Sequence, residues 1–297
     1  MKKFISIILL SIFFVFSLSS CKNVENVPTS NKPLVYSSFY AMYDLTQKIG
    51  KDNIELYNLV SSGIEPHDFE PTANDIIKLE NANVFVYNGA NMEHWVDKVL
   101  NSLQSEKLIT VEASSNVELI SDEQQSDPHV WLSPKNAKIE ANNIKKALIK
   151  ADPQHADSYE KNYNDLALEL DALDKEYSST LSTLPKKDIV VAHRAYSYLC
   201  KEYGLNQIAI NGISPDTEPD PSTMANTIEY CKKHNVNTIF FEEMISPKIA
   251  QVIADELGAK VSVLNPLEGL SEDEIAANDD YFSIMKKNLV ALEGALS

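Results

Sequence analysis

Four residues of metal-binding type stand far apart along this chain, each inside a distinctive local sequence. They are His67, His129, His193 and Glu268, and successive members are separated by 62, 64 and 75 residues. Local zinc motifs instead place their ligands within a few residues of one another. These four residues can meet only where separate parts of a fold come together. Three imidazoles and one carboxylate suit a tetrahedral divalent metal ion, zinc above all.

The surroundings of three of them favour a ligand role over the ordinary role of a solvated or core residue. His67 lies in Glu-Pro-His-Asp-Phe-Glu-Pro and His129 in Asp-Pro-His-Val-Trp-Leu, so prolines restrict each loop and an aromatic side chain anchors it. His193 ends an apolar run, where a neutral imidazole bound to a metal costs little. Glu268, in Asn-Pro-Leu-Glu-Gly, is harder to assign alone, because a loop glutamate is normally solvated.

Other polar residues are weaker candidates for the metal site. Glu242 and Glu243 end an expected strand, where they could orient the histidines or compete with Glu268 as the fourth ligand. The acidic run 121–127 is interpreted as a solvated loop. The remaining histidines fit structural roles better, since they fall in or at the ends of expected helices: His94, His155 and His234.

Short β-branched runs alternate with helical patterns along most of the chain. The expected strands cover 34–38, 54–60, 84–87 and 108–111 in the first half, and 188–192, 206–210, 238–242 and 260–264 in the second. The expected helices cover 42–49, 73–81, 93–100 and 134–151, followed by 196–203, 222–234, 247–257 and 280–296. This alternation predicts an α/β fold with two (β/α)4-like lobes and parallel sheets.

One long helix is expected between the lobes. Residues 154–183 contain no Gly and no Pro, and Tyr and Leu recur at three- and four-residue steps from Tyr159 to Leu181. A helix of this length spans on the order of 45 Å and makes a stiff connection. Ligands of open parallel sheets bind at the carboxyl ends of strands, and all four candidates follow strands, two in each lobe. The sequence therefore predicts a metal site in the cleft between the lobes.

The N-terminus has the pattern of a bacterial lipoprotein signal. Lys2 and Lys3 precede an apolar run that is shorter than the ~20 residues of a membrane-spanning helix, and the run ends in Leu-Ser-Ser before Cys21. Lipidation of Cys21 would anchor the mature chain to the cell membrane; an ordinary signal peptide with a chance cysteine is the alternative. The expected organisation is a signal peptide, a lipidated flexible tether, an N-terminal lobe, the linker helix and a C-terminal lobe, over 1–20, 21–33, 34–152, 153–184 and 185–297.

Composition excludes several classes of function. The chain carries 43 acidic and 26 basic residues, and its net charge of −17 repels nucleic acid. Cys200 and Cys231 fall in expected helices outside any Cys-x-x-Cys motif and are interpreted as buried thiols, although an exported protein could pair them. The sequence has no HExxH, Gly-rich phosphate loop or GxSxG motif, so no enzymatic activity is expected.

These motifs together resemble the metal-binding lipoproteins of ABC importers for zinc and manganese, the ZnuA-like solute-binding proteins of cluster A-I. The resemblance runs from Leu34 to the C-terminus and is carried by segments 66–68, 127–132, 192–196, 240–243 and 265–270, with further matches at 88–89, 212–219 and 246–248. It implies two lobes joined by one long helix, with a metal bound in the cleft. The segment 121–127 departs from many zinc-type members, because it is short and has no histidine.

The resemblance also implies a cargo and a partner. His193 and Glu268 resemble the zinc-type members, whereas the manganese-type members use two histidines and two carboxylates. The chain is thus expected to capture Zn²⁺ outside the cytoplasmic membrane and, as a monomer, to deliver it to an ABC-type metal permease. The alternatives are manganese or iron as cargo, a surface adhesin, and a zinc hydrolase with an open coordination position that Glu268 would close.

Overall fold

The computed structural model describes residues 32–121, 125–215, 219–242, 244 and 246–297. The expected signal peptide, the lipidation site Cys21, nearly all of the tether, and Glu243 lie outside the described residues. Within the described part of the chain, no helix is long and apolar enough to cross a membrane.

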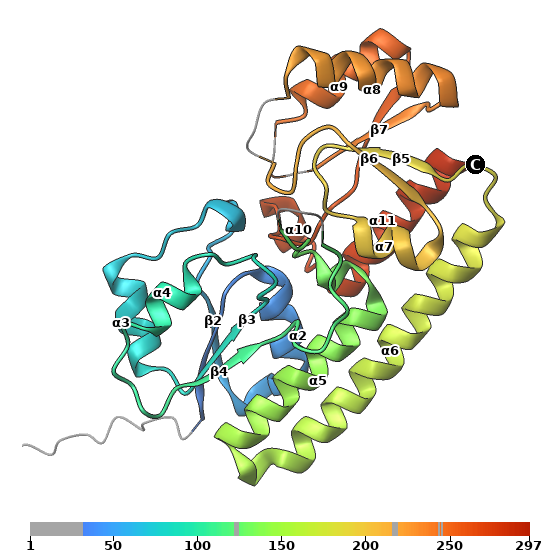
Figure 1. The fold of residues 1–297 in the computed structure, drawn as a ribbon. Helices are drawn as coiled ribbons and strands as arrows, with labels where there is room; N and C mark the ends of the chain where they lie inside the picture. The colour runs from blue at the N-terminus through green and yellow to red at the C-terminus, as the bar shows by residue number, and fades with distance from the viewer. Residues whose placement is uncertain (1–31, 122–124, 216–218, 243, 245) are drawn as a thin grey trace, which may run out of the picture. The chain divides into compact units, whose positions relative to one another are not determined.

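The first four strands form a parallel sheet in the N-terminal half of the fold (Figure 1). β1 (Leu34–Ser37) lies between β2 (Glu55–Asn58) and β3 (Val84–Tyr87), and β4 (Ile109–Glu112) pairs with β3. β3 reads Val-Phe-Val-Tyr and is almost wholly buried, as a central strand of a parallel sheet should be. The accompanying helices are α2 (Tyr40–Gly50), α3 (Ala73–Asn81), α4 (Val96–Leu100) and α5 (Pro134–Ala151).

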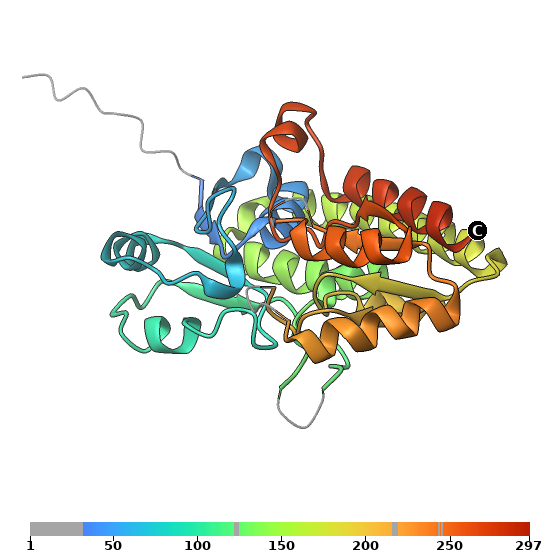
Figure 2. The ribbon, with the colours of Figure 1, turned by 90° about the horizontal axis from the view of Figure 1, so that it is seen from above.

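The next four strands repeat this topology. β5 (Asp188–Val191) lies between β6 (Asn206–Ala209) and β7 (Thr238–Phe241), and β8 (Lys260–Val263) pairs with β7. The helices that follow them are α7 (Ser197–Tyr203), α8 (Pro221–His234), α9 (Lys248–Leu257), α10 (Glu272–Ala276) and α11 (Tyr281–Leu296). Helices α8 and α9 run side by side in both views (Figures 1 and 2). In each sheet the strand order reverses beside the first strand, which is where ligands of open parallel sheets bind.

A single helix, α6 (Ala156–Thr183), joins the two halves. It has 28 residues, follows the short 3₁₀ helix Pro153–His155, and buries a stripe of Tyr and Leu side chains at helical spacing. It packs against α5 and α11, and the Tyr177 hydroxyl donates to the Met285 carbonyl oxygen of α11 at 2.5 Å. The predicted fold class, two parallel α/β lobes joined by one long helix, is confirmed.

Two local features differ from the sequence expectations. The helix expected to begin at Glu93 begins only at Val96. The reason is that the Glu93 carboxylate turns back into the fold, where it accepts hydrogen bonds from the Ser38 hydroxyl and from the backbone amides of Asn88 and Gly89. Helix α10 is not predicted at all, because five residues are too few to show a periodicity.

Hydrophobic side chains from both halves form one continuous core. It includes Val35 and Trp131 from the first half and Ile189 from the second. A smaller core lies under α8 and α9. Cys200 belongs to the large core and Cys231 to the small one, and both are free and buried, as predicted. A shared, close-packed core resists rotation of one half against the other.

Hydrogen bonds also connect the two halves through Trp131. Its indole N–H donates to the Pro266 carbonyl oxygen at 2.7 Å, and its own carbonyl accepts from the Tyr281 hydroxyl at 2.7 Å. Both bonds are buried and therefore strong relative to exposed ones. The first bond holds the loop that carries His129 against the loop that carries Glu268, and the second ties it to the start of α11.

Candidate metal centre

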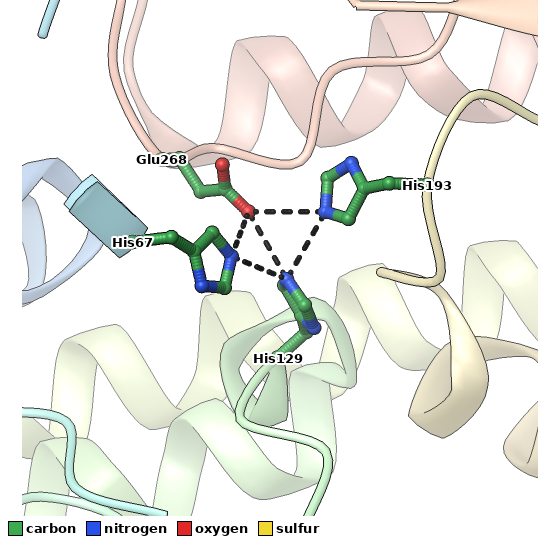
Figure 3. Close-up of side chains that lie close together, drawn as sticks. All are labelled: His67, His129, His193 and Glu268. Carbon is green, nitrogen blue, oxygen red and sulfur yellow. Dashed lines mark hydrogen bonds and ion pairs between the residues drawn. The ribbon is translucent and has the colours of Figure 1, made fainter. Parts of the chain in front are cut away.

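The structure brings His67, His129, His193 and Glu268 together in one buried cluster (Figure 3). Their ligand atoms all lie within 4.8 Å of one another. Nε2 of His129 is 3.2 Å from Nε2 of His67, 3.2 Å from Nε2 of His193 and 3.1 Å from Oε1 of Glu268. The same Glu268 oxygen is 3.5 Å from Nε2 of each of the other two histidines.

Five of the six spacings are close to the edges of a small tetrahedron, and the sixth, between the ligand nitrogens of His67 and His193, lies within the 4.8 Å that bounds the whole cluster. Ligand atoms at ~2.0–2.1 Å from a zinc ion in a regular tetrahedron stand ~3.3–3.4 Å apart. The separations of 3.1, 3.2 and 3.5 Å in the structure lie on both sides of that length. One cation of that size therefore fits among the four atoms with little movement.

Each half of the fold supplies two of the four side chains. His67 lies in the 3₁₀ helix Pro66–Asp68 after β2, and His129 directly precedes a second 3₁₀ helix after β4. His193 comes shortly after β5, and Glu268 shortly after β8. All four thus lie beyond the carboxyl ends of parallel strands.

Carboxylates orient two of the histidines. Nδ1 of His129 donates to Oδ1 of Asp127 at 2.8 Å, and Nδ1 of His193 donates to Oε1 of Glu242 at 2.5 Å. An ionised carboxylate only accepts, so each neutral imidazole keeps its proton on Nδ1 and carries a lone pair on Nε2. Two such lone pairs face each other at 3.2 Å, and only a cation between them, a proton or a metal ion, makes that arrangement favourable.

The electrostatics of the centre favour positive charge. Burial alone lowers the pKa of His193, but Glu242 and Glu268 outweigh burial and raise this pKa well above its ordinary value. Burial likewise lowers the pKa of His129, but Asp127 and Glu268 outweigh burial and raise this pKa. Burial raises the pKa of Glu268, but the three histidines outweigh burial and hold it well below its ordinary value. The surrounding carboxylates thus favour a positive charge at this centre, which a bound metal ion would supply.

A buried amide network positions Glu268. The Asn265 side chain accepts from the Leu267 amide at 2.7 Å and donates to Glu274 at 2.8 Å. The Asn288 side chain binds the Asn265 backbone, both as donor and as acceptor. Leu267 has a φ of 61°, a left-handed conformation that a non-glycine residue adopts only where its surroundings hold it. The loop therefore presents Glu268 rigidly.

His67 is held differently from the other three side chains. Among the described residues its Nδ1 has no carboxylate partner, and burial lowers its pKa. Its own segment anchors it, because Oε1 of Glu65 accepts from the His67 amide at 3.1 Å and Phe69 packs against Trp95 with ring centroids 5.7 Å apart. Burial and repulsion from Glu268 raise the pKa of Glu65 to about 8.

Two carboxylates near the centre, those of Asp127 and Glu65, could hardly be identified from the sequence. The interpretation of 121–127 as a solvated loop is wrong for Asp127, which is buried and bound to His129. The Tyr198 hydroxyl donates to the Asp127 carbonyl oxygen at 2.8 Å and draws the end of the loop inward. Glu65 could have been found only from its place two residues before His67.

The remaining histidines lie away from the centre. The His94 side chain is 56% exposed, His155 pairs with Asp152 at 2.6 Å, and His234 pairs with Asp188 at 3.1 Å. Over the described residues, no other group of histidine, cysteine and acidic side chains has the spacing of metal ligands.

Comparison with known proteins reveals close relatives along nearly the whole described chain. The family described as "ZnuA: Zinc-uptake complex component A periplasmic" matches residues 35–295. The chain is 41% identical over 277 residues to the high-affinity zinc uptake system protein ZnuA of Bacillus subtilis, covering 88% of this chain and 87% of that protein. It is 38% identical over 308 residues to the zinc-binding protein AdcA of Streptococcus pyogenes serotype M1. That match covers 96% of this chain but only 59% of AdcA.

A solved structure shows the same architecture. The Zn(II)-bound ZnuA-like domain of Streptococcus pneumoniae AdcA superposes with a TM-score of 0.81 at 38% identity, covering 89% of this chain and 99% of that one. Two four-stranded parallel sheets, one long helix and a buried His₃Glu cluster define a solute-binding protein of the cluster A-I fold. The chain belongs to the ZnuA family of zinc-uptake components. Membership in this transport family confirms the expectation that the chain is not an enzyme.

Proposed function

We propose that this protein captures Zn²⁺ outside the cytoplasmic membrane, with His67, His129, His193 and Glu268 as ligands, and delivers it to an ABC-type permease. The observation that carries this proposal is the buried set of three imidazole nitrogens and one carboxylate oxygen at tetrahedral spacing. The family, described as a component of a zinc-uptake complex, supports both the cargo and the permease as partner. Zn²⁺ is then transported ligand and not a resident cofactor.

The donor set favours zinc over manganese. Imidazole nitrogen suits zinc, whereas manganese prefers more oxygen donors. Glu268 occupies the fourth corner of the tetrahedron, so the centre lacks the open position that a hydrolytic zinc site keeps. Glu242 orients His193 and raises its basicity, which strengthens its bond to a metal.

Metal titration tests this proposal. Calorimetry in competition with a chelator is expected to give a one-to-one complex with Zn²⁺, and binding of Mn²⁺ should be weaker by at least about 100-fold. A Zn²⁺ concentration of ~1,000 times Kd should raise Tm by about 10 °C, because bound ligand adds ~4 kcal/mol to the folded state. Retention of Mn²⁺ by the protein in the presence of excess Zn²⁺ would show that manganese is the cargo.

We place the mature chain at the outer face of the cell membrane, anchored through Cys21 behind a signal peptide over 1–20 and a tether over 21–33. The description of the family as periplasmic supports an extracytoplasmic location. Cells given labelled palmitate should incorporate it into the native protein, whereas Cys21→Ala should carry no label and leave the membrane fraction. Cys231→Ala is the matched control and should keep the label. Labelling of Cys21→Ala would exclude Cys21 as the anchor.

We also infer that one chain is the functional unit, with lobes over 34–152 and 185–297 and the linker over 153–184. Each chain holds a complete set of four ligands, so a second copy is not required to close the site. Light scattering of the zinc-loaded protein should give the mass of a monomer, and the mass of a dimer would contradict this inference.

A further inference from the structure

His129 is the central ligand of the metal centre. Its Nε2 is 3.1 or 3.2 Å from the ligand atom of each of the other three side chains (Figure 3). A shift of His129 therefore changes three of the six separations between ligand atoms at once. Asp127 orients the ring of this histidine, but the ring keeps its position only if the backbone that carries it is also fixed. The backbone just before His129 has a support of its own.

Asn88, the residue directly after β3, holds this backbone. Its side-chain Nδ2 donates to the Pro128 carbonyl oxygen at 2.9 Å and to the Gly89 carbonyl oxygen at 2.8 Å. Asn88 is wholly buried, so both bonds are stronger than exposed ones would be. Pro128 directly precedes His129 and has no backbone N–H, so its carbonyl is the only polar backbone group by which it can be held. Asn88 therefore fixes the chain at the residue next to the ligand.

The Asn88 side chain leaves one of its own polar atoms without a partner. Its Oδ1 is buried and accepts no hydrogen bond from the described residues. Turning the amide over would place Oδ1 against two carbonyl oxygens, so the orientation that donates to both carbonyls is the favourable one. A buried acceptor without a donor destabilises a fold. What the fold gains from Asn88 is therefore its bonds to the backbone, one of which lies beside His129.

Glu93 in turn holds Asn88. Its Oε1 accepts from the Asn88 backbone amide at 2.8 Å and from the Ser38 hydroxyl at 2.6 Å, and its Oε2 accepts from the Gly89 amide at 2.9 Å. Burial raises the pKa of Glu93 to about 6, although these three hydrogen bonds oppose the rise, so the carboxylate is ionised at neutral pH. Hydrogen bonds to an ionised group are roughly twice as strong as neutral ones. Ser38 directly follows β1, so the support of His129 begins at a central strand of the first sheet.

We propose that Asn88 and Glu93 are positioning residues for the metal, which hold the backbone at Pro128 so that His129 meets the other three ligands at 3.1–3.2 Å. The proposal rests on the zinc-binding function proposed above. Neither residue belongs to the four ligands, so both act through His129. Zinc binds best when its four ligands stand in a tetrahedron. Residues that only orient the ligands typically change metal affinity by about 10- to 100-fold.

Asn88→Leu tests this role, because leucine is similar in size to asparagine and has no donor. Competition with a chelator is expected to show Zn²⁺ binding that is about 10- to 100-fold weaker than in the native protein. Asn162→Leu is the matched control. Asn162 is also a buried asparagine, and its Nδ2 donates to the Ile49 carbonyl oxygen at 2.9 Å, near the end of α2 that leads into β2 and so opposite the metal centre. This control should lose thermal stability but bind Zn²⁺ within about twofold of the native affinity.

The absorption of bound Co²⁺ separates a positioning role from a purely structural one. Co²⁺ absorbs visible light strongly in a tetrahedral site and weakly in a six-coordinate one. Glu93→Gln keeps one accepting oxygen but turns a donor N–H₂ toward a backbone amide, so it should loosen Asn88 and weaken Zn²⁺ binding at least about fivefold. Both variants should absorb less per bound Co²⁺ at saturation than the native protein. Asn162→Leu, which is only less stable, should keep the native spectrum.

Three results would overturn the positioning role. They are Zn²⁺ affinities of Asn88→Leu and Glu93→Gln within about twofold of the native value, losses no larger than that of Asn162→Leu, and an unchanged Co²⁺ absorption at saturation. If Asn88→Leu does not fold, Glu93→Gln decides the question by the same two measurements. Failure of the native protein to bind Zn²⁺ would instead overturn the proposed function, so the two ideas can fail separately.

Discussion

Replacing His193 with alanine is expected to weaken Zn²⁺ binding by about 10²- to 10³-fold. Structural zinc sites bind with ~10–16 kcal/mol, so one ligand of four contributes ~2.5–4 kcal/mol, and about 1.4 kcal/mol corresponds to a factor of ten. The variant also leaves Glu242 buried without its imidazole partner, so the metal-free protein should unfold more easily. Competition with a chelator measures the affinity, and thermal unfolding measures the stability.

Selectivity should change in the same variant. Mn²⁺ depends less on imidazole ligands, so its affinity should fall less than that of Zn²⁺, and the ratio of the two affinities should narrow. His94→Ala is the matched control, since it removes an exposed imidazole whose nearest carboxylate, in Glu70, is 4.0 Å away. A Zn²⁺ affinity of His193→Ala within about threefold of the native value would show that His193 is not a ligand.

Zn²⁺ affinity is expected to fall as the pH decreases from about 8 to about 6, by up to ~100-fold per pH unit. Zinc needs the Nε2 lone pairs of His129 and His193. Burial lowers the pKa of both residues, but nearby carboxylates outweigh burial and raise it. Protons therefore already compete with zinc above pH 6.5, the ordinary pKa of histidine. Each zinc ion that binds displaces two protons, which makes the affinity change about 100-fold per pH unit. Calorimetry in buffers of different ionisation enthalpy counts these protons, and a constant affinity over this range would contradict the prediction.

Stability of the metal-free protein should depend on pH in the opposite direction. The folded pKa of His193 is raised above its unfolded value of 6.5. The stabilisation from its ion pair is thus fully present below pH 6.5 and is lost as the pH rises through the folded pKa. Glu242→Gln removes the negative charge, so this low-pH stabilisation should shrink and proton competition with zinc should move to lower pH. Unfolding curves of both proteins at several pH values would detect the difference.

Local sequence predicted those elements whose ends depend on neighbouring residues. β3 and α3 begin and end where the sequence places them, because an apolar run marks the strand and a capping box between Thr72 and Asp75 starts the helix. The start of α4 could not be predicted in this way. It depends on a hydrogen bond between Glu93 and Ser38, which are 55 residues apart.

The same distinction holds at the metal centre. The types and local frames of His67, His129, His193 and Glu268 identified them as candidates, and the strand pattern placed them at one edge of two sheets. Asp127 was misinterpreted because an acidic run is normally solvated, and only packing against the C-terminal half buries its last residue. The boundaries of the domains remain a prediction.

The sequence by itself determined which residues could bind a metal, their positions after successive parallel strands, and the long helix that joins the lobes. These properties follow from residue type and from periodicities of a few residues. Only the tertiary structure decided the separations of 3.1–3.5 Å and the unequal support of the four side chains. These depend on contacts such as that between Trp131 and Pro266, 135 residues apart, which form only when both halves pack together. That packing supports His129, His193 and Glu268, whereas His67 is held mainly by its own segment.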